Sequence, residues 1–151
     1  MSEEKILIVE DDASVREILR DTLRHYTNYE LMMAVDGEEG LQRALEDNPS
    51  VMLLDLALPG IGGLEIMERL NAENKRIPTI IITADNRGET ILRAFRLGAK
   101  DFLRKPFHLK EIRSALENAL TEERRRRERD TPTRALTIAN PHQQRQFDNW
   151  V

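Results

Sequence analysis

Five short apolar segments recur before residue 106, and this recurrence constrains the fold more than any other feature of the sequence. A turn signal or a stretch of apolar residues at helical spacing follows each segment. Strands that alternate with helices build βα units, in which the strands lie parallel and the crossovers are right-handed. The pattern therefore predicts an α/β fold with a five-stranded, doubly wound parallel sheet. The expected strands are residues 5–9, 29–35, 51–55, 77–83 and 101–105.

Three of these segments, residues 5–9, 51–55 and 77–83, are apolar along almost their whole length. A half-exposed strand alternates apolar and polar side chains, whereas a strand covered on both faces is apolar throughout. We therefore expect these three to be the central strands. Apolar residues about one helical turn apart predict helices around residues 15–23, 41–45, 64–70, 91–95 and 109–120.

The charge pattern changes after Leu120. Residues 122–130 read EERRRRERD, a run of mixed charge that can continue the last helix with solvated side chains. Residues 131–151 are polar and hold few apolar anchors, which is typical of a linker or a loosely ordered tail. We expect one domain over residues 1–120, followed by a charged helical extension and polar tail or linker over residues 121–151.

Composition excludes several kinds of site. The chain has no Cys, so a disulfide, a zinc–thiolate site and a cysteine nucleophile are all excluded. The N-terminus is acidic and lacks the apolar stretch of a signal peptide, and no apolar run reaches the roughly 20 residues of a membrane helix. We therefore expect a cytoplasmic protein.

Ionisable and hydroxyl side chains follow four of the expected strands. Glu10 and Asp11 end the first strand, Asp55 the third, Thr83 the fourth and Lys105 the fifth. In an open parallel sheet, functional groups gather beyond the carboxyl ends of the strands. Two carboxylates about 4 Å apart repel by roughly 4 kcal/mol at an effective dielectric near 20, and Mg²⁺ is the usual oxygen-liganded cation that offsets this cost. The set suits phosphoryl transfer to a carboxylate.

A purely structural interpretation competes with this one. Any one of these residues alone is more simply read as the cap of a helix or turn, and Asp12 is well placed to cap a helix that starts at Ala13. Their combination on four strand ends favours a functional site.

Four fragments occur in order and with compatible spacing: ILIVEDD at residues 6–12, LDLALPG at 54–60, ITA at 82–84 and GAKDFLRKPF at 98–107. Together they resemble the receiver domain of two-component response regulators, in the same family as the chemotaxis single-domain regulators. The resemblance covers roughly residues 4–120. It implies a flavodoxin-like sheet with the strand order 2-1-3-4-5.

The resemblance also implies roles for single residues. Asp55 would be the phosphoacceptor for a histidine kinase or phosphotransfer protein. Asp11, Asp55 and the Ala57 carbonyl would hold Mg²⁺ directly, with Mn²⁺ as an alternative, and Glu10 would act through water. Lys105 would contact the phosphoryl oxygens.

Three further positions would control the switch. Thr83 would move toward the phosphoryl group once it arrives, and Phe102 would report that movement on the face made by the fourth helix, fifth strand and fifth helix. Ala57 and Asp85 flank the phosphoryl group and would tune its hydrolysis. Ala57 has no side-chain group to position the attacking water, whereas Asp85 has one.

The implied function is a signalling switch rather than a turnover enzyme. It would catalyse its own phosphorylation and slow dephosphorylation and control a downstream effector protein or a fused output domain. A homodimer would form through the switching face or the helical extension. Direct DNA binding is not expected, because the arginines of residues 124–127 lie among acidic residues without aromatic interleaving.

Two other functions compete. A metal-dependent phosphohydrolase with an aspartyl nucleophile needs a second carboxylate two residues after the nucleophile, and Ala57 stands there. A phosphorylation-independent adaptor resembles receivers that have lost their acidic residues, and this chain keeps them.

Overall fold

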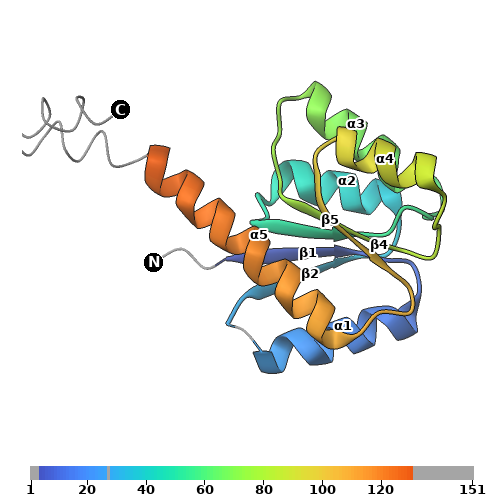
Figure 1. The fold of residues 1–151 in the computed structure, drawn as a ribbon, viewed down its shortest axis with the longest axis horizontal. Coiled ribbons are helices and arrows are strands. Elements are labelled where there is room, and N and C mark those ends of the chain that lie inside the picture. Colours follow the sequence, from blue (N-terminus) through green and yellow to red (C-terminus); the bar gives the residue numbers. More distant parts are fainter. Residues whose placement is uncertain (1–3, 27, 131–151) are drawn as a thin grey trace, which may run out of the picture. The chain divides into compact units, whose positions relative to one another are not determined.

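The computed structural model describes residues 4–26 and 28–130, which form a parallel sheet with helices on both faces (Figure 1). All neighbouring strands are parallel, in the order β2-β1-β3-β4-β5. The predicted fold class and strand order are confirmed. The elements are β1 (Lys5–Val9), α1 (Ala13–Tyr26), β2 (Glu30–Ala34), α2 (Gly37–Glu46), β3 (Val51–Leu54), α3 (Gly63–Ala72), β4 (Thr79–Thr83), α4 (Gly88–Arg96), β5 (Ala99–Arg104) and α5 (Leu109–Asp130).

The central strands β1, β3 and β4 are buried, as their continuous apolar sequences predicted. Every residue of β3 and β4 is buried, and so are four of the five residues of β1. The edge strands β2 and β5 mix buried and exposed positions, because a neighbouring strand protects them on one side only.

Alternate residues of each central strand enter two separate cores. Ile6 and Ile8 pack in a cluster that includes Leu19 of α1 and Leu116 of α5. Leu7 and Val9 point the other way, into a cluster supplied by α2, α3 and α4. The period of two along a strand thus explains why both faces need helices. Each fully buried Leu or Ile contributes about 1.5–3 kcal/mol through removal of apolar surface from water.

Some expected boundaries were wrong by one or two residues. The fourth strand begins at Thr79 rather than at residue 77, since Pro78 has no N–H to donate to a ladder, although its carbonyl accepts from Met52 at 2.9 Å. The fifth strand begins two residues earlier than expected, at Ala99, which pairs with Thr79 just before a register shift. Ile18 and Phe95 belong to the apolar helical spacing, yet they are 52% and 44% exposed.

A close contact fixes the loop that follows β3. A Cβ on Gly63 would lie 2.6 Å from the carbonyl oxygen of Asp55, closer than side-chain carbons approach a backbone oxygen. The missing side chain lets the Gly63 N–H donate to the Leu56 carbonyl at 3.1 Å. The start of α3 therefore packs directly against the chain segment that carries Asp55.

The chain divides into two units, with the boundary between Leu120 and Thr121. Helix α5 continues to Asp130 and so includes the charge-rich run of residues 122–130. Within the second unit, Glu123 accepts two hydrogen bonds from Arg126 at 2.8 Å. The predicted tail or linker over residues 131–151 lies outside the described residues. Among the residues that the structure describes, no helix is long and apolar enough to cross a membrane.

Candidate functional site

Backbone hydrogen bonds of the sheet place the predicted side chains at one edge, the one formed by the carboxyl ends of the strands. The Asp55 N–H donates to the Val9 carbonyl at 3.0 Å, and the Lys105 N–H donates to the Thr83 carbonyl at 2.9 Å. These bonds extend the pairing one residue beyond β3 and β5. The residues that follow the parallel strands therefore start from the same edge, as expected for this fold.

Three carboxylates meet at this edge. One carboxylate oxygen from each of Glu10, Asp11 and Asp55 lies within 4.8 Å of the other two. Glu10 and Asp55 are buried, at 0% and 3% exposure, whereas Asp11 is exposed. The structure brings together the three acids that the sequence placed after two different strands.

Lys105 contacts two of these acids. Its Nζ lies 2.7 Å from Asp55 Oδ2 in a hydrogen bond and 2.6 Å from Glu10 Oε1 in an ion pair. The second contact lacks hydrogen-bond geometry, so Glu10 Oε1 is buried without a hydrogen-bond partner. One ammonium group against three carboxylates leaves the cluster with an excess of negative charge.

Burial and pairing shift two pKa values at the site. Burial raises the pKa of Glu10, although the contact with Lys105 and the Asp12 N–H oppose the shift. For Lys105, burial disfavours the charged form, but the close contacts with the Asp55 and Glu10 carboxylates outweigh it and raise the pKa. Lys105 is therefore protonated at neutral pH, while the Glu10 carboxylate lies in surroundings that disfavour its charge.

Asp12 has a structural role. Its Oδ1 accepts hydrogen bonds from the Ser14 N–H at 2.8 Å and the Val15 N–H at 3.4 Å, so it caps α1. The predicted cap is confirmed, and the carboxylate of Asp12 is not part of the three-acid cluster.

One contact at this edge was not predicted. The Arg16 Nη1 donates to the Glu10 carbonyl at 2.8 Å and so ties α1 to the end of β1. No motif in the sequence signals this bond, because it depends on how a long side chain folds back across a helical turn.

Asp55 has partners on both carboxylate oxygens. The Ala57 N–H donates to Oδ1 at 3.0 Å, and Lys105 binds Oδ2. Thr83 is fully buried at the end of β4, and its hydroxyl accepts a long hydrogen bond of 3.4 Å from the Asp85 N–H.

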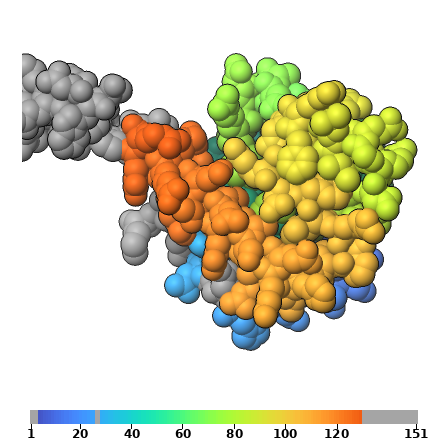
Figure 2. Space-filling view, viewed as in Figure 1, coloured from blue at the N-terminus to red at the C-terminus, as the bar shows by residue number. Residues whose placement is uncertain are grey.

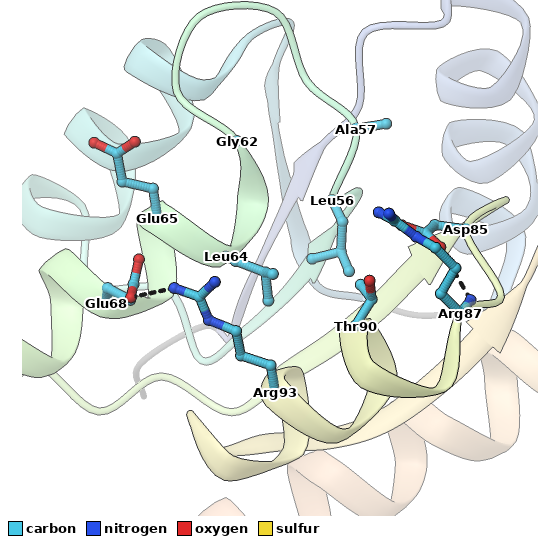
Figure 3. A pocket seen from close by; sticks show the side chains of 10 residues that line it. All are labelled: Leu56, Ala57, Gly62, Leu64, Glu65, Glu68, Asp85, Arg87, Thr90 and Arg93. Carbon is cyan, nitrogen blue, oxygen red and sulfur yellow. Dashed lines mark hydrogen bonds and ion pairs between the residues drawn. The ribbon is translucent and has the colours of Figure 1, made fainter.

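A groove of about 490 Å³ lies beside this edge, between the β3–α3 loop, α3 and the start of α4 (Figure 3). Ala57 and Asp85 both line it. Two ion pairs also lie on it: Arg87 to Asp85 at 2.8 Å and Arg93 to Glu68 at 2.6 Å. Sequence reasoning identified Asp85 and missed the arginines, which stand in α4 and the turn before it without a distinctive motif.

The predicted switching face carries exposed apolar side chains. Figure 2 shows α4 and β5, in yellow and gold, on one face of the molecule together with the start of α5 in orange. Leu92 and Phe95 of α4 are 50% and 44% exposed. Phe102 of β5 is partly buried and packs against the cluster that faces α2, α3 and α4.

The donor set fits a hard divalent cation. All three clustered side chains offer oxygen, the ligand atom that Mg²⁺ prefers. The buried Glu10 Oε1 without a hydrogen-bond partner and the excess of carboxylates over ammonium groups point in the same direction.

Comparisons with known proteins identify the family of this chain. The family model "Response regulator receiver domain" matches residues 6–117. The chain is 34% identical over 122 residues to the uncharacterized transcriptional regulatory protein YkoG of Bacillus subtilis, covering 81% of this chain and 53% of YkoG. It is 32% identical over 136 residues to the response regulator MprA of Mycobacterium avium, covering 90% of this chain and 58% of MprA. The chain thus spans about half the length of the curated relatives it matches.

Solved structures show the same fold. A putative response regulator from Chloroflexus aurantiacus has a TM-score of 0.72 and 34% identity, with 80% of this chain and 99% of that chain covered. The N-terminal domain of an uncharacterized protein from Wolinella succinogenes has a TM-score of 0.74 and 33% identity, with 82% and 98% covered. These matches do not favour the phosphohydrolase or adaptor hypotheses. The chain belongs to the response regulator receiver domain family of two-component signalling, whose mechanism is phosphorylation of an aspartate.

Proposed function

We propose that Asp55 accepts a phosphoryl group from a histidine kinase or phosphotransfer protein. The observation that carries this proposal is the setting of its carboxylate: 3% exposed, 2.7 Å from the Lys105 ammonium and clustered with the oxygens of Glu10 and Asp11. In the transfer, an Asp55 oxygen bonds to phosphorus while the phosphorus–nitrogen bond of the phosphohistidine breaks. The bonding electrons return to the imidazole nitrogen.

The site's own residues supply positioning and charge. The Ala57 N–H holds one Asp55 oxygen at 3.0 Å, which orients the carboxylate. Lys105 lies close enough to Asp55 to contact the phosphoryl oxygens when they arrive. Positioning and charge neutralisation account for most of the catalysis of phosphoryl transfer, and these two residues supply part of each.

We propose that Asp11, Asp55 and the Ala57 carbonyl hold Mg²⁺, or Mn²⁺ in its place, and that Glu10 acts through a water molecule. The oxygen donors and the excess negative charge of the cluster support this assignment. A bound divalent cation supplies positive charge that offsets the carboxylates and the incoming phosphoryl oxygens.

The proposed switch begins at Thr83. Its buried hydroxyl accepts a hydrogen bond from the Asp85 N–H that is long, at 3.4 Å. Little hydrogen-bond energy is therefore lost when the Thr83 hydroxyl moves toward a phosphoryl group. Thr83 ends β4 and α4 follows it, so the movement would displace the start of α4. We propose that Phe102 follows and that the face of α4, β5 and α5 then changes its affinity for an effector protein, a fused output domain or a second copy of the chain.

We also propose a division of labour along the chain. Residues 1–120 would work as the receiver, and residues 121–151 as an extension toward an output partner. The receiver would dephosphorylate slowly, since Ala57 offers the attacking water no side-chain group and only Asp85 remains beside it.

The test is phosphorylation from a small donor. The full chain is incubated with acetyl phosphate, with and without Mg²⁺, and its intact mass is measured. We expect a labile gain of one phosphoryl group that requires Mg²⁺ and disappears in Asp55→Asn. Asp12→Asn is the matched control, because it changes a neighbouring acid that caps α1 and should keep the modification. An unmodified wild type, or a modified Asp55→Asn, would contradict the proposal.

A further inference from the structure

The carboxylate of Asp85 is held mainly by Arg87, two residues along the chain, and the Thr90 side chain makes a smaller contribution. Asp85 Oδ1 accepts from the Arg87 backbone N–H and from its Nε, both at 3.0 Å. Oδ2 accepts from Nη2 at 2.8 Å and from Nε at 3.3 Å. Four contacts from three N–H groups therefore converge on one carboxylate, and the Nε–H is shared between its two oxygens.

These contacts use most of the acceptor capacity of the group. An ionised carboxylate offers about four lone-pair positions, and here each oxygen accepts two contacts. The guanidinium also neutralises the charge, and these hydrogen bonds hold the pKa of Asp85 at about 2. Such a carboxylate is a weak base, and Arg87 occupies most of its acceptor positions.

The clamped carboxylate lies beside the proposed phosphorylation site. Asp85 follows Thr83 by two residues, and its N–H donates to the Thr83 hydroxyl. It shares the groove with Ala57, whose N–H binds Asp55. Figure 3 shows Asp85 and Arg87 together on one side of the groove, with Glu65 and Glu68 on the other.

Hydrolysis of an aspartyl phosphate needs an oriented water. The water oxygen bonds to phosphorus, the bond between phosphorus and the Asp55 oxygen breaks, and the Asp55 carboxylate leaves with the bonding electrons. Both hydrogens of the water end on the dihydrogen phosphate product. An acceptor beside the phosphoryl group speeds this step by holding the water in line, and Ala57 has none to offer.

We propose that Arg87 is a positioning residue that withholds the Asp85 carboxylate from this water and so prolongs the phosphorylated state. The inference rests on the proposed phosphorylation of Asp55. If the inference holds, the hydrolysis rate depends on both Asp85 and Arg87 and not on Asp85 alone.

The experiment measures the lifetime of the phosphoryl group. Wild type, Arg87→Ala, Arg87→Lys, Asp85→Ala and the double variant Asp85→Ala/Arg87→Ala are phosphorylated with acetyl phosphate and Mg²⁺ and then freed of the donor. The fraction modified is followed by intact mass. Arg87 is 69% exposed, so its replacement leaves the fold intact.

Arg87→Ala should shorten the lifetime by about threefold to tenfold, since both side-chain donors and three of the four contacts are lost, while the exposed ion pair limits the size of the effect. Arg87→Lys should restore part of the wild-type lifetime. The double variant should match Asp85→Ala, because the arginine acts through that carboxylate. Arg93→Ala is the control, since Arg93 lies on the same groove but pairs with Glu68.

Three results would overturn the inference. They are an unchanged or longer lifetime in Arg87→Ala, the same acceleration when Asp85 is already Ala, and an equal acceleration in Arg93→Ala. A wild type that takes no phosphoryl group would instead refute the proposed function, and the inference would fall with it.

Discussion

Ion pairs of nearly equal length occur in two regions of this molecule, and they differ in what surrounds them. Lys105 lies 2.7 Å from Asp55 and 2.6 Å from Glu10, with 20%, 5% and 0% of the three side chains exposed. Arg93 lies 2.6 Å from Glu68 on the groove, with 56% and 44% exposed. Distance alone therefore says little about the energy of a pair. Water screens the groove pair, whereas the buried acids depend on their partner.

The largest expected effect is the loss of the buried ammonium. Lys105→Ala leaves the Glu10 and Asp55 carboxylates buried without their cation, which we expect to cost about 2–4 kcal/mol of unfolding free energy without divalent cations. Urea denaturation in EDTA measures this cost. An unchanged midpoint and slope would mean that water already solvates these acids as well as it does the groove pair.

Metal binding should produce the next largest effect. A cation that binds only the folded chain stabilises it by about 1.4 kcal/mol at ten times its Kd. We expect Mg²⁺ to raise the urea midpoint of the wild type, and removal with EDTA to reverse the gain. Asp11→Asn should lose most of it, while Asp12→Asn should keep it. Equal responses in these two variants would contradict the assignment of the cluster.

The Arg93–Glu68 pair on the groove should contribute little to stability. Arg93→Gln is expected to change the unfolding free energy by less than about 1 kcal/mol, because both side chains are solvated. Added salt should reduce even this difference, since screening weakens exposed pairs. A loss as large as that of Lys105→Ala, measured in the same urea titration, would remove the contrast between the regions.

The smallest effect concerns the other groove pair and is a matter of pH. The hydrogen bonds from Arg87 lower the pKa of Asp85 to about 2 from its ordinary 3.8. The stabilisation linked to this shift is present above the ordinary value and is lost as pH falls through the range between the two. In Arg87→Ala, we expect a carboxyl NMR titration to show the Asp85 pKa rising toward 3.8. A value that stays near 2 would show that another group holds the carboxylate.

Much of the site follows from residue order alone. A parallel sheet sends every strand's carboxyl end to one edge, so Glu10, Asp55 and Lys105 had to approach one another once the strands were recognised. Continuous apolar runs marked the central strands, because a strand that is covered on both faces needs apolar side chains on both.

Other features depended on side-chain directions that no spacing encodes. Asp11 and Asp12 are adjacent acids after the same strand, yet Asp11 joins the carboxylate cluster and Asp12 caps α1. The choice depends on which N–H groups each carboxylate meets after the chain turns into the helix.

The sequence by itself thus determined which acids, which hydroxyl and which ammonium group stand at the strand ends. Only the tertiary structure decided which conformations the long arginine side chains adopt. Arg16 binds the Glu10 carbonyl, and Arg87 occupies the carboxylate of Asp85. Strand ends are fixed by backbone hydrogen bonds that recur in every parallel sheet, whereas an arginine has several rotatable bonds and takes its position from local neighbours.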